Sequence, residues 1–186
     1  MREEVTALLE NRNELLTITY FKIQELFDKK YGENALVLME IGTFFEVYEV
    51  NNEKEKIGKA KEIAELLNIQ LTRKNKSILE NSKENPIMAG VPAISFEKHL
   101  ARIIAEQKYT IAIIRQKGTP PNVSRYLDVV VSPGTNFDFV VEQDDNFITS
   151  IVIDQVRGNY LIGYSAIDVT TAKCYYNEVF GTHEDK

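Results

Sequence analysis

The sequence has only one cysteine, Cys174, and no long run of apolar residues. A lone cysteine excludes a disulfide within the chain and is typical of a reducing compartment. Because Cys174 lies in an aromatic strand pattern without a neighbouring histidine or cysteine, we expect it to be buried and unreactive. No segment approaches the roughly 20 apolar residues that span a bilayer, and residues 1–4 lack a signal-peptide pattern. We therefore expect a cytoplasmic protein that makes no contact with a membrane.

Basic residues are outnumbered in this chain. The 22 Lys and Arg against 28 Asp and Glu give a formal net charge of −6 and a pI near 5.1. Strong autonomous binding to nucleic acid needs clustered cations that neutralise phosphates, so this balance argues against it. The densest cationic stretch is Arg73-Lys74-Asn75-Lys76. Any nucleic-acid function must rest on local contacts or on domains outside this chain.

Motifs for catalysis are scarce. We find no Gly-x-x-x-x-Gly-Lys-Ser/Thr phosphate loop, so we expect no ATP hydrolysis by this chain. Asp154 and Asp168 lie on predicted strands, but two carboxylates without further ligands are a weak indication of a two-metal nuclease. His99 lies between core positions of a predicted helix, and His183 lies in a polar tail. We therefore predict no catalytic residue, no metal site and no cofactor in this chain.

The spacing of apolar residues predicts an α/β fold for the first part of the chain. Helical spacing extends from Val5 to Tyr31, with a break near residues 11–13 and a C-terminal cap at Gly32. The other expected elements are a strand at 35–41, a helix from about residue 51 to Asn68, strands at 69–72, 110–114 and 129–131, an ordered turn region at 86–92, a helix capped by Ser95, and a type II turn at 132–135.

A short acidic link at residues 142–146 separates this part from a second one, so we expect domains at 1–141 and 142–186. Beyond the link, residues 147–153, 160–164, 166–169 and 174–176 indicate consecutive strands. Strands without a covering helix form an incomplete layer. We therefore expect the second unit to be truncated and the chain to be a fragment of a longer protein.

The most informative stretch is Ile41-Gly42-Thr43-Phe44-Phe45-Glu46-Val47-Tyr48, which we interpret as strand residues interrupted by glycine. A period of two places Phe45 and Val47 on one face, with Phe44 and Glu46 on the other. If the first face is toward the core, an aromatic ring and a carboxylate project side by side. Such a pair suits the reading of a base step in a nucleic-acid groove. The alternative is two core phenylalanines beside a solvated glutamate.

The order of the motifs resembles the amino-terminal part of the DNA mismatch repair protein MutS family, over residues 19–176. The motifs are Gly-x-Phe-aromatic-Glu at 42–46, Leu71-Thr72 followed by basic residues, Pro86-Ile87-Met88-Ala89-Gly90-Val91-Pro92, and Ser132-Pro133-Gly134-Thr135. The Phe-x-Glu motif and the Pro-x-Met-Ala-Gly-Val-Pro string are specific for that family.

The resemblance implies a mixed sheet flanked by helices at 1–141, the mismatch-recognition domain, and the start of a connector domain with a ribonuclease H-like strand meander at 142–186. It implies that Phe44 is a wedge that stacks on a mispaired base in the minor groove, and that Glu46 hydrogen-bonds this base. The ligand would be double-stranded DNA with mismatches or small loops. An ATPase domain with ATP and magnesium would lie beyond residue 186, in a homodimer with a MutL-type partner. The isolated chain would be a monomer.

Two charge arguments accompany these roles. A carboxylate in the groove is repelled by phosphates, so Glu46 would penalise binding to intact DNA unless a base offers it a partner. If that partner is an acceptor nitrogen, the carboxyl must be protonated, which desolvation favours. Arg73, Lys74 and Lys76 are candidate contacts to the DNA backbone, with a solvated loop as the alternative. Lys117 and Arg125 are weaker candidates.

Several positions depart from the family pattern. Thr43 and Phe45 stand where Asp and Tyr are common, and Ala93-Ile94-Ser95 replace an aromatic residue followed by His. Arg115 replaces Glu, and Ser132 replaces Thr. These departures indicate a divergent branch. They leave open a relative that uses this domain for branched DNA or protein contacts without reading mismatches.

Overall fold

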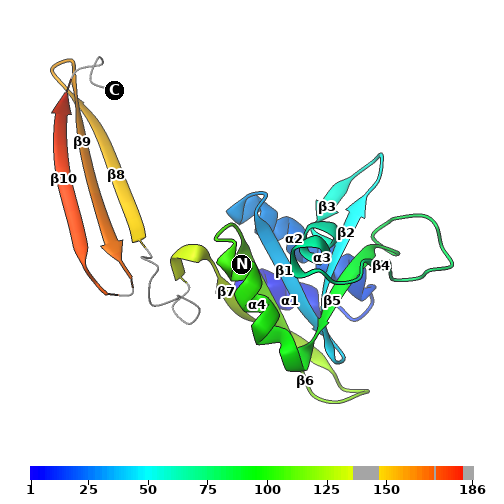
Figure 1. The fold of residues 1–186 in the computed structure, drawn as a ribbon. Helices are drawn as coiled ribbons and strands as arrows, with labels where there is room; N and C mark the ends of the chain where they lie inside the picture. The colour runs from blue at the N-terminus through cyan, green and yellow to red at the C-terminus, as the bar shows by residue number, and fades with distance from the viewer. Residues whose placement is uncertain (136–146, 170, 182–186) are drawn as a thin grey trace. The chain divides into compact units, whose positions relative to one another are not determined.

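A mixed β-sheet between two pairs of helices forms the first unit, Met1–Pro133 (Figure 1). The structure is a computed structural model that describes residues 1–135, 147–169 and 171–181. The helices of this unit are α1 (Arg2–Glu10), α2 (Leu16–Tyr31), α3 (Ala60–Leu67) and α4 (Phe96–Ala105). The strands are β1 (Ala35–Ile41), β2 (Phe44–Asn51), β3 (Lys56–Gly58), β4 (Thr72–Arg73), β5 (Ile87–Pro92), β6 (Thr110–Lys117) and β7 (Ser124–Val131). The domain boundary predicted at 141/142 and the link at 142–146 lie outside the described residues.

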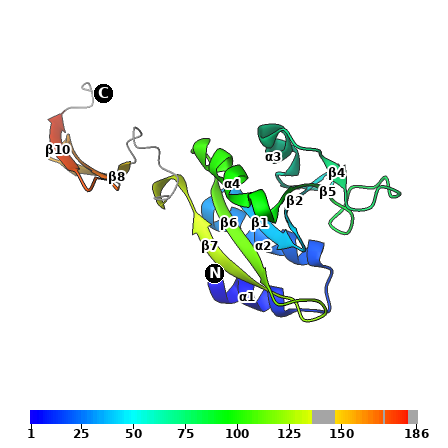
Figure 2. The same cartoon turned by 60° about the horizontal axis from the view of Figure 1, so that its bottom comes forward.

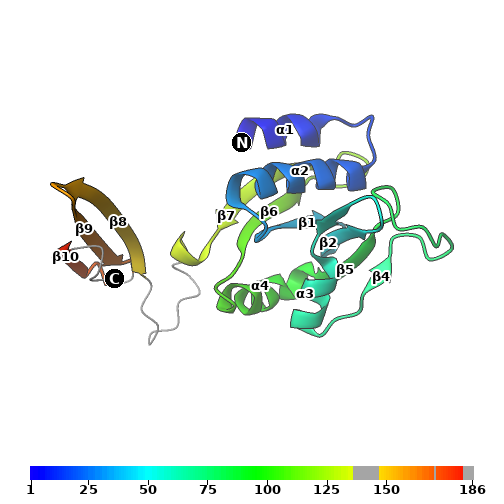
Figure 3. The ribbon, with the colours of Figure 1, turned by 90° about the horizontal axis from the view of Figure 1, so that it is seen from above.

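The strand order in this sheet is β4-β5-β2-β1-β6-β7, with β3 paired to β2. The β1–β6 pair is parallel and the other pairs are antiparallel. Helices α1 and α2 cover one face, and α3 and α4 cover the other (Figure 2, Figure 3). The predicted mixed sheet flanked by helices is therefore confirmed.

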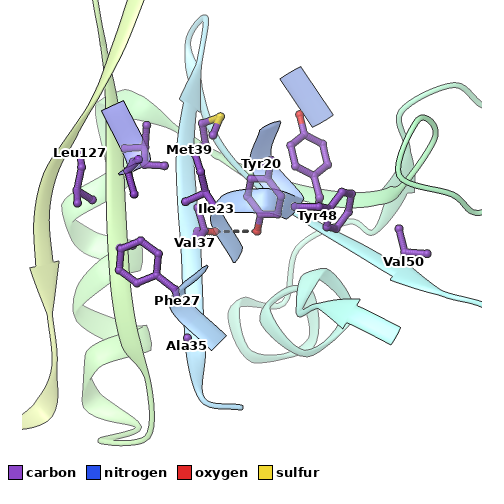
Figure 4. Close-up of a cluster of buried hydrophobic side chains, with 13 residues drawn as sticks. Tyr20, Ile23, Phe27, Ala35, Val37, Met39, Tyr48, Val50 and Leu127 are labelled. Carbon is purple, nitrogen blue, oxygen red and sulfur yellow. Dashed lines mark hydrogen bonds between the residues drawn. The ribbon is translucent and has the colours of Figure 1, made fainter. Parts of the chain in front are cut away.

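The face under α1 and α2 holds a continuous apolar core (Figure 4). The predicted break near residues 11–13 separates the two helices, and Gly32, with φ of 81°, ends α2 as expected. The core side chains come from both helices and from four strands: Val5, Tyr20, Phe21, Ile23, Phe27, Ala35, Val37, Met39, Tyr48, Val50, Ala112, Ile114 and Leu127.

Helix α2 also hydrogen-bonds the start of β1. The Tyr20 hydroxyl donates to the Val37 carbonyl at 2.9 Å (Figure 4). The Gln24 amide accepts from the Val37 N–H and donates to the Ala35 carbonyl, both at 3.0 Å. Strand β1 pairs with β2 only next to their turn, from Met39 to Ile41. The buried backbone groups at the start of β1 need other partners, and the side chains of α2 supply them. Burial raises the pKa of the Tyr20 hydroxyl, which therefore stays a donor.

Four local predictions were wrong. The strand expected at 69–72 is reduced to β4, since only Thr72 and Arg73 pair with β5. Residues 56–58 form strand β3 rather than the first turn of a helix, because Ile57 pairs with Val50 of β2. Residues 87–92 form strand β5 rather than a turn region, since Pro86 precedes the strand and Pro92 ends it, so neither interrupts the ladder. Residues Pro133–Thr135 form a 3-10 turn in place of a type II turn.

The second unit, Gly134–Lys186, contains the antiparallel meander β8 (Phe147–Val156), β9 (Asn159–Asp168) and β10 (Cys174–Gly181). The predicted run of strands is confirmed, although the runs at 160–164 and 166–169 merge into β9. Cys174 is exposed rather than buried, because side chains on both faces of β10 are exposed in the described part of the chain. Among the described helices, none has the length and apolar character needed to cross a membrane.

Candidate nucleic-acid interface

Gly42 and Thr43 form a two-residue turn that joins β1 to β2, with Ile41 facing Phe44 across it. The φ of Gly42 is +63°, a conformation that side chains disfavour and that suits glycine at the first position of a type II′ turn. The glycine therefore does not interrupt a strand, as the sequence suggested, but turns the chain. Phe44 consequently lies at the tip of a β-hairpin.

The two adjacent phenylalanines point to opposite faces of the sheet. Phe45 is 1% exposed and stacks on Phe96 of α4, with ring centroids 3.6 Å apart and an interplanar angle of 17°. Phe44 is 44% exposed. Val47 is buried on the same face as Phe45, so the predicted period of two is confirmed. The Phe44 ring is thus available to a ligand, and Phe45 anchors the strand that carries it.

The Glu46 carboxylate is held by two side chains. Its Oε2 accepts a hydrogen bond from the Tyr48 hydroxyl, and the Lys74 ammonium lies 3.3 Å from the same oxygen. Lys74 also donates to the Tyr48 hydroxyl oxygen at 3.0 Å. The Glu46 side chain is 12% exposed, so it is neither core nor freely solvated. Burial, and then the charge of Glu46, raise the pKa of Tyr48, which remains a hydroxyl donor.

The side chain of Gln116 braces the hairpin tip from strand β6. Its amide donates to the Gly42 carbonyl at 2.7 Å and accepts from the Gly42 N–H at 3.1 Å. The Thr43 carbonyl accepts from the N–H of Ala93, the residue directly after β5, at 2.8 Å, which fixes the tip from a second side. No local pattern in the sequence indicates this contact, because Gln116 and Gly42 are 74 positions apart.

The three predicted backbone-contacting cations have different surroundings. Arg73 donates from Nη1 to the carbonyls of Ile78 and Leu79, so it shapes the loop after β4. Lys74 faces Glu46, as described above. Lys76 is exposed and has no hydrogen bond or ion pair to any described residue. Of the three, Lys76 has the surroundings expected of a side chain that contacts phosphates.

The weaker cationic candidates also differ from each other. Arg125 is partly buried and donates to the Glu40 carbonyl at 3.1 Å, which supports the strand leading into the hairpin. Burial lowers the pKa of Arg125. Lys117, at the end of β6, is exposed. Arg125 therefore serves the fold, and Lys117 remains accessible.

The carboxylates considered for a nuclease are not brought together. Asp154 pairs with Leu161, whereas Asp168 pairs with Phe147 at the other end of the β8–β9 ladder. Seven residues along a strand separate these points by roughly 23 Å, too far for a shared metal pair. No group of three or more potential metal ligands occurs among the residues that the structure describes.

Comparison with known proteins gives the same family as the motifs. The MutS domain I family matches residues 20–140. A DNA mismatch repair protein mutS homolog of Acanthamoeba polyphaga mimivirus is 28% identical over 95% of this chain and 16% of its own length. The DNA mismatch repair proteins MutS of Halothermothrix orenii and Chlorobium phaeobacteroides are 27% and 29% identical over 85% and 81% of this chain.

The chain spans about one sixth of these relatives, 16% of each. The family match nevertheless covers more than half of the chain, and it contains the whole braced hairpin with Phe44 and Glu46. The chain belongs to the MutS family, and residues 20–140 are its MutS domain I.

Proposed function

We propose that this chain is the mismatch-recognition module of a MutS-type mismatch repair protein and that it inserts Phe44 into the minor groove of mispaired or looped duplex DNA. The observation that carries this proposal is the half-exposed Phe44 ring at the tip of a hairpin braced by Gln116 and anchored by Phe45. An exposed aromatic ring on a rigid tip has the geometry of a wedge.

The physical basis of discrimination is the resistance of DNA to unstacking. Opening and kinking a base step costs a few kcal/mol, and less where pairing is already defective. Stacking of Phe44 on a base returns about 1–3 kcal/mol. The ring therefore converts weak pairing into a difference in binding without reading a particular sequence. Glu46, two residues farther along β2, would bond the displaced base.

The remaining roles follow from membership of the family. Relatives in this family are named DNA mismatch repair proteins, and the chain matches their MutS domain I and spans 16% of their length. Hydrolysis of ATP with magnesium, the homodimer and the MutL-type partner would therefore belong to other parts of the intact, cytoplasmic protein. This chain would supply no catalytic group. Lys76 and Lys117 would contact phosphates and set the position of the hairpin on the duplex.

The test is a titration of matched and singly mismatched duplexes with the intact protein and its Phe44→Ala variant. We expect the variant to bind both duplexes with the affinity that the parent has for matched DNA. Phe44→Leu is the matched control, because it keeps an apolar side chain and loses the aromatic face. It should show an intermediate preference. An equal loss of affinity on both duplexes would contradict the wedge and favour a role in branched DNA or protein contacts.

A further inference from the structure

The two oxygens of the Glu46 carboxylate have different surroundings. Oε2 receives both contacts, one from the Tyr48 hydroxyl and one from the Lys74 ammonium. Oε1 has no hydrogen bond to any residue in the described part of the chain. Glu46 lies on the same face of the hairpin as the exposed Phe44 ring. Phe44 is two residues closer to the tip of the hairpin than Glu46. One oxygen is thus occupied by the protein, and the other is left for a ligand.

We propose that Tyr48 and Lys74 are positioning residues, which hold Glu46 by Oε2 so that Oε1 faces the mispaired base. This inference rests on the proposed function, because it assigns the base contact to one atom of the same site. Neither residue touches the DNA base itself; each acts through the glutamate.

Tyr48 is suited to this role because its ring is enclosed in the core under α2. The residue is fully buried, and the ring makes an edge contact with Tyr20, with centroids 4.9 Å apart (Figure 4). Tyr20 is itself fixed by its bond to the Val37 carbonyl. The hydroxyl of Tyr48 is therefore a donor at a fixed point of the core. A glutamate bound to such a point loses less conformational entropy when it meets a ligand.

Lys74 is suited to a second task, which is to offset the charge of Glu46. Its ammonium lies 3.3 Å from Oε2 and 5.4 Å from the centroid of the Tyr48 ring. The backbone of Lys74 is also fixed, because its N–H donates to the Pro86 carbonyl at 3.0 Å. A carboxylate with a cation beside it is repelled less by the phosphates of a duplex. Lys74 therefore has a different role from that of the exposed Lys76.

The first test removes the hydroxyl of Tyr48 and keeps its buried ring. In the intact protein, Tyr48→Phe should lower the ratio of mismatched to matched affinity about three- to tenfold, the range for one hydrogen bond. The affinity for matched DNA should not change. In a Glu46→Ala background, the same Tyr48→Phe change should have no effect on the ratio, because the group that it positions is absent. An effect that persists in this background would overturn the positioning role.

The second test compares Lys74→Met with Lys76→Met over a range of salt concentrations. Lys74→Met should lower the affinity ratio, because Glu46 then loses one of the two groups that hold its Oε2. Lys76→Met should weaken both duplexes equally and reduce the slope by about 1. A Lys74→Met variant that behaves like Lys76→Met would overturn the assignment of Lys74 to Glu46.

The Glu46→Ala variant alone separates this inference from the proposed function. A lower affinity ratio in Glu46→Ala with no effect of Tyr48→Phe or Lys74→Met would overturn only the positioning roles. An unchanged ratio in Glu46→Ala would overturn the base contact of Glu46, and the positioning roles with it.

Discussion

Glutamine in place of Glu46 should strengthen binding to fully paired DNA. In the parent chain, Lys74 lies 3.3 Å from the Glu46 carboxylate. The Glu46→Gln side chain has nearly the same size and keeps one oxygen that can accept hydrogen bonds from Tyr48 and Lys74. The substitution removes one negative charge beside the wedge. It also leaves the ammonium of Lys74 without its counter-charge, so the hairpin gains the equivalent of up to one cation near the phosphates.

The magnitude follows from counterion release. One additional neutralised phosphate steepens the dependence of log affinity on log salt by up to about 0.9. The advantage of Glu46→Gln over the parent on matched DNA should therefore shrink about 3.5-fold when monovalent salt rises from about 50 to about 200 mM. The ratio of mismatched to matched affinity should fall, because the penalty on matched DNA is reduced.

Fluorescence anisotropy with a matched duplex, at both salt concentrations, measures this effect directly. Glu33→Gln is the matched control, since it makes the same charge change on an exposed residue before β1, at the end of the strand opposite the hairpin. Unchanged or weaker binding of matched DNA by Glu46→Gln would refute the repulsion argument. An equal gain in Glu33→Gln would show that net charge, rather than position, is responsible.

Three further predictions concern the support of the hairpin and of strand β1. Phe45→Ala should lower the free energy of unfolding by about 3–5 kcal/mol in urea titrations, because a buried, stacked ring is lost, whereas Phe44→Ala should lower it far less. Gln116→Ala removes two bonds to Gly42, each worth about 0.5–1.5 kcal/mol, and should reduce mismatch preference in a binding titration. Gln24→Met leaves the Ala35 carbonyl and the Val37 N–H without their partner. It should lower the free energy of unfolding, measured by calorimetry, by about 1–3 kcal/mol for each of these groups.

Local patterns predicted much of the fold correctly. The period of two separated exposed Phe44 from buried Phe45, and the helical spacing located the apolar faces of α2 and α4. Gly32 and Asn68 end their helices with positive φ, as their positions indicated. These features depend on neighbours within a few residues, so the sequence contains them directly.

Other features depend on contacts between distant parts of the chain. Strand β5 exists because β2 and β4 lie on either side of it, although its prolines suggested a turn region. Lys74 was predicted to contact phosphate, yet it lies against Glu46, 28 positions earlier. Gln116 braces Gly42 across 74 positions. No local pattern encodes such pairs, which arise only when the sheet brings β2, β4 and β6 together.

Site-specific photo-crosslinking from position 44 tests the wedge most directly. The intact protein with p-benzoylphenylalanine in place of Phe44 is irradiated on a duplex with one mispair, and the crosslinked nucleotides are mapped. The ring inserts at the defect, so the crosslinks should fall on the mispaired bases and their immediate neighbours, and a fully paired duplex should yield few. Crosslinks spread evenly along both duplexes would contradict insertion of Phe44. Crosslinks found only at the duplex ends, wherever the mispair lies, would contradict it as well.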